Sequence, residues 1–185
     1  HTALLFKAHK SNYTISGFTH EASVRELAAL AHRRGLPMMY DIGSGLLRRP
    51  RGLPLENEPD VRTGLEEGAD LVGFSCDKLL GGPQAGIVVG KTEFVRRLAA
   101  APMMRALRVG KLTLAALSAA CRAYLTDKRL TESNPTFAML SESTPRSGER
   151  AEELAKKLRR NGVPCSVVDN RARVGGGTLP ELIVP

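Results

Sequence analysis

A lysine follows directly after a predicted buried strand in the middle of the chain. The segment is Phe74–Gly86, FSCDKLLGGPQAG, and the lysine is Lys78. Lysine is seldom buried unless its amine is used, and an amine in a dry pocket loses proton affinity and becomes nucleophilic. Such an amine is suited to forming a Schiff base with an aldehyde cofactor. Ser75 offers a hydroxyl to a cofactor phosphate, and Gly81 and Gly82 let the backbone pass close to a ligand.

An acidic partner for such a cofactor lies upstream, in the segment YDIGSG. Asp41 follows the predicted strand Pro37–Tyr40, and Gly43 and Gly45 leave space for a ring. A carboxylate against the pyridine nitrogen of pyridoxal phosphate (PLP) keeps the ring protonated, so that it withdraws electrons from the substrate's α-carbon. Taken singly, Lys78 fits a surface lysine in a glycine-rich loop and Asp41 fits a loop or N-cap aspartate. Their order, strand–Asp and then strand–Ser-x-x-Lys, is the arrangement of aminotransferase-like PLP enzymes.

Strands and helices alternate over the first two-thirds of the chain. The expected strands are Ala3–Ala8, Pro37–Tyr40, Leu71–Phe74 and Gly86–Val89, and the expected helices are Ser23–Arg34, Val61–Glu67, Thr92–Ala100 and Lys111–Leu125. Ser23 and Glu26 form a capping-box pattern, and Gly35 is a helix stop. The alternation predicts an α/β domain with a mostly parallel sheet. Because ligands gather at the carboxyl ends of such strands, Asp41 and Lys78 are expected to face one crevice.

The last third of the chain reads as part of a second unit. Polar loops are expected at 127–135 and 141–147, a helix at Glu149–Arg160, a strand at Cys165–Val168 and a glycine-rich turn at Val174–Thr178. We therefore expect two units, residues 1–125 and 126–185, the second too short to close a core comfortably. The chain also starts abruptly in a predicted strand, which suggests that an upstream part is missing.

Composition narrows the class of protein and partner. The net charge of +8 over 185 residues favours polyanionic partners, although a basic protein with no nucleic-acid role accounts for it equally well. Aromatic residues make up only 4% and tryptophan is absent, which argues against a base-stacking platform. The three cysteines are widely spaced without a CxxC, so we expect no metal site and reduced thiols in the cytoplasm. No apolar run is long enough for a membrane span, and no Walker loop occurs.

Four segments together resemble the bacterial L-seryl-tRNA(Sec) selenium transferases, also called selenocysteine synthases. They are SCDKLLGGPQAG, DIGSG, SNYTISGFT and PMMRALRVGKLTLAAL, and the resemblance runs from about Thr2 to Leu125 and more weakly to VGGGTLPEL. It implies the C-terminal half of an aminotransferase-like (PLP fold type I) large domain, with part of a small α/β C-terminal domain. It also implies that the family's tRNA-binding domain and first half-domain precede this chain, so that the chain alone would be inactive.

The resemblance also implies roles for residues around the lysine. Lys78 would carry PLP, Asp41 would pair with its pyridine nitrogen, and Ser75 would approach its phosphate. Asp77 matches an aspartate that the family uses in catalysis. No metal is implied.

Downstream, Arg105 and Arg108 match arginines that bind the selenium donor, selenophosphate. Two guanidiniums can clamp a phosphate group, although without the resemblance both arginines read as a solvated face. The segment Ser11–Tyr13 follows a strand and is placed to line the pocket, without an assigned role.

Three positions depart from the family pattern. Cys76 stands where the family commonly has glycine, Gly110 where it has aspartate, and Lys10 where it has threonine. A thiol at position 76 would narrow the pocket or be open to oxidation. These departures bear on substrate detail more than on the PLP site.

The implied activity is the conversion of seryl-tRNA(Sec) to selenocysteinyl-tRNA(Sec), by loss of the serine hydroxyl and addition of selenium from selenophosphate. Family members assemble as large homo-oligomers, which suggests a decamer. One alternative keeps the fold and makes the protein a PLP lyase acting on a small amino acid or amino sugar acid. Another makes it a non-catalytic, basic RNA-binding or scaffold protein.

Overall fold

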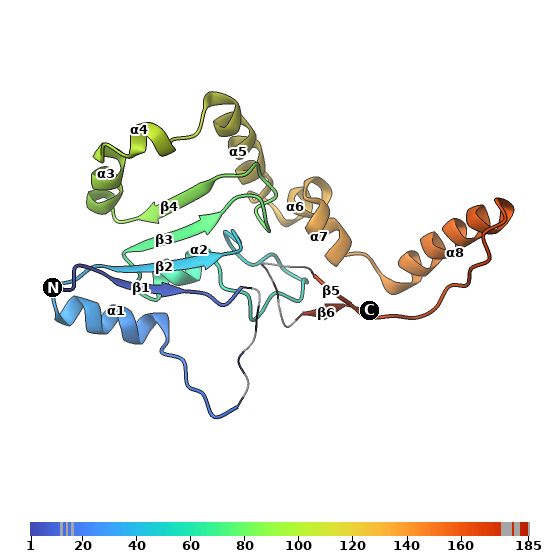
Figure 1. Ribbon diagram of the computed structural model, residues 1–185, viewed down its shortest axis with the longest axis horizontal. Helices are drawn as coiled ribbons and strands as arrows, with labels where there is room; N and C mark the ends of the chain where they lie inside the picture. Colours follow the sequence, from blue (N-terminus) through green and yellow to red (C-terminus); the bar gives the residue numbers. More distant parts are fainter. Residues whose placement is uncertain (12, 14, 16, 175–178, 180–181, 185) are drawn as a thin grey trace.

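The computed structural model describes residues 1–185 apart from 12, 14, 16, 175–178, 180–181 and 185. At its centre is a four-stranded sheet in the order β1-β2-β3-β4 (Figure 1). The strands are β1 (Leu5–Ala8), β2 (Met38–Gly43), β3 (Leu71–Ser75) and β4 (Gly86–Gly90). β1, β2 and β3 run parallel, and β4 is antiparallel to β3. The prediction of an α/β fold with a mostly parallel sheet is confirmed.

Two helices cover one face of this sheet, α1 (Val24–Arg33) and α2 (Val61–Glu66). The capping box predicted for α1 is present, because the Ser23 hydroxyl accepts from the Glu26 backbone and the Glu26 carboxylate accepts from Ser23 N. Alternate residues of β2 are buried beneath the helices. The others, among them Asp41, are half-buried on the opposite face. The strand period of two therefore puts Asp41 on the face away from α1 and α2.

Beyond β4 the chain forms an arc of three helices, which Figure 1 shows at the outer edge of the sheet. They are α3 (Thr92–Ala100), α4 (Met104–Leu107) and α5 (Lys111–Ala123). Neither α3 nor α4 has a buried residue, whereas Leu117 and Ala123 of α5 are buried in the core. Only the end of the arc is therefore fixed by apolar packing.

Two short helices, α6 (Asp127–Ser133) and α7 (Pro135–Leu140), occupy a segment whose larger part was predicted as a loop. The prediction of a loop at 127–135 is wrong. Thr126 and Asn134 cap the two helices with their side chains, and Pro135 follows in the first turn. Phe137 is fully buried and meets Tyr124 edge to face, with ring centroids 6.0 Å apart. Tertiary packing thus stabilises helices that are too short to form alone.

The remaining chain forms α8 (Thr144–Arg160) and a two-stranded ribbon, β5 (Ala172–Arg173) with β6 (Ile183–Val184). The predicted helix at 149–160 is confirmed, but α8 begins inside the predicted loop 141–147. Cys165–Val168 is not in a strand, so that prediction is wrong, and most of the predicted turn at 174–178 lies outside the described residues. Figure 1 shows α8 far from the sheet. Among the helices described, none combines the length and apolar character that crossing a bilayer requires.

Candidate functional site

The predicted lysine and aspartate meet at the carboxyl end of the parallel strands. Oδ1 of Asp41 accepts a hydrogen bond from Gly43 N at 2.9 Å. A Cβ atom placed on Gly43 would lie 3.7 Å from Lys78 Nζ and 3.4 Å from Ser11 Oγ. The amine, the carboxylate and the hydroxyl therefore surround one glycine, and all four residues are half-buried.

Backbone hydrogen bonds hold Lys78 at this place. The next residue, Leu79, donates its N–H to the Ser44 carbonyl at 2.9 Å. The Lys78 carbonyl accepts from Gly81 N at 3.0 Å, which closes a tight turn around the lysine. The lysine turn is thus tied to the segment that follows β2, so the positions of Asp41 and Lys78 are coupled.

A close backbone approach at Gly45 brings the ends of β2 and β3 together. Gly45 has φ +76°, and a Cβ there would lie 2.2 Å from the Ser75 carbonyl oxygen. No larger residue fits without moving one of the two segments. Ser75 is the last residue of β3 and is half-buried. Its predicted contact with a cofactor phosphate stays a prediction.

These side chains fit PLP. An amine able to form a covalent link and a carboxylate able to hold a protonated ring nitrogen both border Gly43. The side chain that Gly43 lacks would fill the space between the Lys78 amine and the Ser11 hydroxyl. The glycine therefore keeps a side chain out of the space that borders the amine and the hydroxyl.

The predicted selenophosphate ligands are not part of this cluster. Arg105 lies on α4 and Arg108 is its C-terminal cap, at the rim beyond β4 (Figure 1). Both are exposed, and neither guanidinium makes a hydrogen bond or ion pair with another residue that the structure describes. Asp77 is also exposed, next to Lys78 in sequence. The roles predicted for these three residues stay predictions.

The structure places two of the departures from the family pattern, and it explains the one at Cys76. Cys76 is fully buried in the hydrophobic core, where burial raises the pKa of its thiol. It therefore contributes to packing and does not present an exposed thiol beside Lys78. Gly110 is the N-cap of α5 and provides no side-chain hydrogen bond to the helix.

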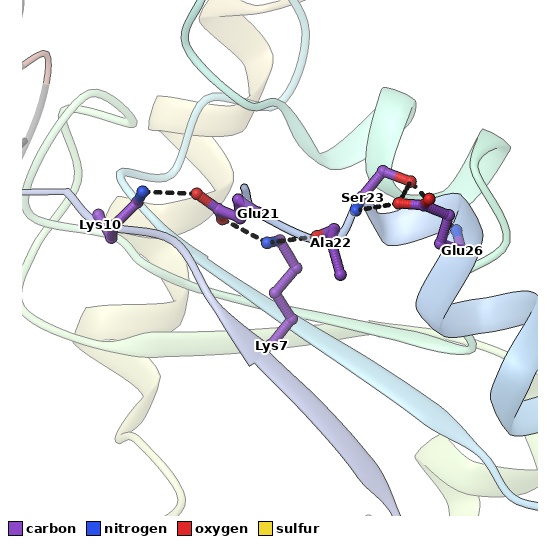
Figure 2. A network of polar contacts seen from close by, with 6 residues as sticks. All are labelled: Lys7, Lys10, Glu21, Ala22, Ser23 and Glu26. Atoms are coloured by element: carbon purple, nitrogen blue, oxygen red, sulfur yellow. Dashed lines mark hydrogen bonds and ion pairs between the residues drawn. The ribbon is translucent and has the colours of Figure 1, made fainter. Parts of the chain in front are cut away.

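A polar network, drawn in Figure 2, holds the segment that carries Ser11. Lys7 and Lys10 approach the Glu21 carboxylate from two sides, Lys10 at 2.6 Å, and Lys7 also donates to the Ala22 carbonyl at 2.9 Å. Hydrogen bonds from Lys10 and Lys7 lower the pKa of Glu21 to about 2. The two lysines thus anchor the far end of the segment just before α1.

Besides Ser44 Oγ, two buried polar groups were missed from the sequence. His9 Nε2 and Glu58 Oε1 are buried without a hydrogen-bond partner among the described residues. The position of His9, directly after a strand, was a signal of the same kind as those of Asp41 and Lys78. Glu58 lies in an irregular loop where no spacing pattern marks it. Asn12, within the predicted pocket-lining segment, lies outside the described residues.

Comparison with known proteins assigns the family. All of residues 1–185 match the family model described as L-seryl-tRNA selenium transferase. The chain belongs to the L-seryl-tRNA selenium transferase family. Curated L-seryl-tRNA(Sec) selenium transferases of Solidesulfovibrio magneticus, Geobacter sulfurreducens and Aquifex aeolicus are 45%, 44% and 42% identical to it. Each alignment covers 100% of this chain and 40%, 40% and 41% of those proteins, respectively.

The chain thus spans about 40% of the length of these relatives. Similar solved structures include a D-glucosaminate-6-phosphate ammonia-lyase, at 20% identity and TM-score 0.47, covering 66% of this chain and 29% of the lyase. A Sphingomonas wittichii serine palmitoyltransferase matches at 18% identity and TM-score 0.45, covering 86% of this chain and 35% of that protein. The family assignment rests on the sequence matches and not on these weaker likenesses.

Proposed function

We propose that this chain is the cofactor-bearing part of a PLP-dependent enzyme that converts seryl-tRNA(Sec) to selenocysteinyl-tRNA(Sec) with selenophosphate. The observation that carries the proposal is the meeting of Lys78 Nζ, the Asp41 carboxylate and Ser11 Oγ around Gly43. Membership of the selenium transferase family supports the substrate class. Because the chain spans about 40% of its relatives, the activity belongs to the full-length protein.

Each residue of the cluster has a task that follows from its chemistry. When bound, PLP supplies an electron-withdrawing ring that stabilises negative charge at the substrate's α-carbon. Lys78 holds the cofactor covalently, and its Nζ is the atom that takes the α-proton. Asp41 keeps a positive charge on the ring nitrogen, and Ser75 approaches the phosphate. Ser11 Oγ borders the same point over Gly43 as Nζ and helps to position the amine.

The remaining steps need residues around the cluster. The serine hydroxyl leaves as water and selenium takes its place on the β-carbon, while water cleaves the selenium–phosphorus bond and the phosphorus ends as inorganic phosphate. Asp77 assists this exchange, and Arg105 and Arg108 clamp the selenophosphate. Both arginines belong to the arc beyond β4, in which neither α3 nor α4 has a buried residue.

The assembly and the cellular compartment are inferred from the same family membership. We infer a homo-oligomer, as large as a decamer, in the cytoplasm, where three free cysteines are in keeping with a reducing compartment. Residues 1–125 form the large-domain part and residues 126–185 part of a small domain. At their junction, Asn134 Nδ2 donates to the Leu79 carbonyl at 2.9 Å, which ties the second unit to the lysine turn.

Neither alternative is favoured. A PLP lyase for small amino compounds shares the cofactor cluster, but the curated relatives described above are named for selenium transfer to tRNA. A basic scaffold protein needs no amine, carboxylate and hydroxyl around one glycine.

The test is an ultraviolet–visible scan of the full-length protein with PLP, before and after borohydride. We expect an absorbance band of a Schiff base that borohydride abolishes while fixing the cofactor to Lys78. Lys78→Ala removes the band and lowers selenium transfer by about 100-fold or more, the scale of a lost proton-transfer group. Lys128→Ala, an exposed lysine on α6, is the control that keeps both. A Lys78→Ala protein that keeps band and product would refute the assignment.

A further inference from the structure

The carbonyl group of Leu79, the residue directly after Lys78, accepts hydrogen bonds from two buried side chains. Tyr124 donates its hydroxyl to this oxygen at 3.0 Å, and Asn134 donates Nδ2 at 2.9 Å. Tyr124 is 5% exposed and Asn134 is 4% exposed, so neither bond competes with bulk water. A carbonyl oxygen has two lone pairs, and both are used here. The backbone that follows Lys78 is therefore held by two donors at once.

The two donors come from opposite sides of the junction between residues 1–125 and 126–185. Tyr124 is the C-cap of α5, and Asn134 lies between α6 and α7. The Asn134 amide is in close contact with the lysine turn, because a Cβ placed on Gly81 would lie 2.5 Å from its Nδ2. Glycine is required at that position for the amide to stay where it is. Both units of the chain thus contact the lysine turn.

Each donor is itself held in place by further hydrogen bonds. Arg48, in the loop after β2, donates from Nε at 3.0 Å and from Nη2 at 2.8 Å to the Tyr124 carbonyl. Oδ1 of Asn134 accepts from Thr136 N at 3.0 Å, which orients the amide so that Nδ2 faces the Leu79 carbonyl. Groups that are fixed in this way can hold a neighbouring functional side chain in one geometry.

We propose that Tyr124 and Asn134 are positioning residues for Lys78, and that they act by holding the backbone from which its amine extends. The inference rests on the proposed function and adds two residues to it. Neither side chain needs to touch the cofactor, because both act through the Leu79 carbonyl. A displacement of about 1 Å can slow a reaction about 100-fold. Loss of either bond should therefore slow the reactions of the amine without removing it.

The test compares Tyr124→Phe with Tyr40→Phe in the full-length protein. Tyr124→Phe removes only a hydroxyl, and the Leu79 carbonyl keeps its bond from Asn134, so this variant should fold. We expect the first-order rate of Schiff-base formation at saturating PLP to fall about tenfold, and kcat to fall with it. The KM for seryl-tRNA should not change. Tyr40→Phe, at a tyrosine of β2 that is 6% exposed, is the control that keeps both rates.

A second variant, Asn134→Ser, tests the other donor. Serine keeps an oxygen that can cap α7, but it has no amide to reach the Leu79 carbonyl. The same two rates should fall, and the double variant Tyr124→Phe/Asn134→Ser should lose more than either single variant, because the carbonyl then has no side-chain donor. Asn161→Ser, at the exposed C-cap of α8, is the matched control that keeps both rates.

The outcomes separate this inference from the proposed function. A Schiff base on Lys78 that forms at the wild-type rate in both variants overturns the positioning role and leaves the enzyme assignment standing. An equal loss of rate in Tyr40→Phe overturns it too. If the wild type forms no Schiff base, the proposed function fails, and hydrogen exchange at Gly81 N in the apoprotein decides: faster exchange in Tyr124→Phe supports the hold on the lysine turn, and unchanged exchange overturns it. If one variant fails to fold, the other decides.

Discussion

The two ends of the central sheet treat their buried polar groups in opposite ways. At the amino end of β3, Asp70 is 2% exposed and has three partners, Lys91 Nζ at 2.6 Å, Met38 N at 2.7 Å and His32 Nε2 at 2.9 Å. Burial alone would raise the pKa of Asp70, but these hydrogen bonds outweigh it and hold the pKa below its usual value. The contacts of Asp70 at the amino end therefore stabilise the folded state.

At the carboxyl end some buried polar groups have no hydrogen-bond partner among the described residues. These groups are side-chain atoms of His9, Ser44 and Glu58. The Ser44 carbonyl accepts from Leu79 N, next to Lys78, and His9 N donates to the Asp41 carbonyl. The two ends of one sheet therefore serve different purposes. Polar groups that are hydrogen-bonded inside the protein stabilise the fold, whereas buried polar groups without a partner are available to a ligand.

The largest expected effect tests the close approach at the carboxyl end. In the full-length protein, Gly45→Ala should cost about 3 kcal/mol or more of unfolding free energy, because it adds backbone strain and a clash with the Ser75 carbonyl. PLP retention should fall with it, since the lysine turn must move. Urea unfolding and the Schiff-base band measure the two effects.

The control for Gly45 is Gly35→Ala. Gly35 also has a positive φ, +64°, but a Cβ there meets nothing within 4 Å. It should lose only the strain energy, about 1 kcal/mol, and keep the cofactor. Equal costs for the two variants would contradict the close packing of the two strand ends.

A smaller effect is expected at the amino end. Asp70→Ala should destabilise the protein by about 2–4 kcal/mol, because it leaves the buried Met38 N–H unpaired and removes a carboxylate with three partners. The Schiff-base band per folded molecule should not change, since this end is remote from Lys78. Glu153→Ala, an exposed carboxylate on α8, should stay within about 0.5 kcal/mol. Loss of the band in folded Asp70→Ala would show that the two ends are not separate.

The smallest effect concerns the ion pairs of Figure 2 and their dependence on pH. The pKa of Glu21 falls from 4.5 to about 2 on folding, so its contribution to stability is present above pH 4.5 and is lost as pH falls toward 2. Because Glu21 is partly exposed, that contribution should not exceed about 1 kcal/mol. The unfolding free energies of wild type and Glu21→Gln should therefore differ at pH 7 and converge near pH 2. If the difference in unfolding free energy between the two proteins grew as the pH fell, the pKa of Glu21 would not be lowered by folding.

Local signals in the sequence were sufficient for the central sheet and its first helices. Ser23 and Glu26 predicted the start of α1, because a capping box is a contact within four residues. The loop predicted at 127–135 was wrong for a different reason. Its polar residues favour turns when isolated, but Thr126 and Asn134 act as helix caps once Phe137 packs on Tyr124. A strand at 165–168 failed to form because strands need pairing partners that spacing alone does not supply.

The sequence by itself determined that Asp41 follows one strand and Lys78 follows a later one. Through its motifs it also determined the family. Each motif that gave these predictions is a run of residues close together along the chain. Only the tertiary structure decided that Ser11 joins Lys78 at Gly43, and that Glu58 Oε1 and His9 Nε2 are buried without a partner among the described residues. Those contacts join segments from separate parts of the chain, and their burial depends on how the loops pack at the end of the sheet.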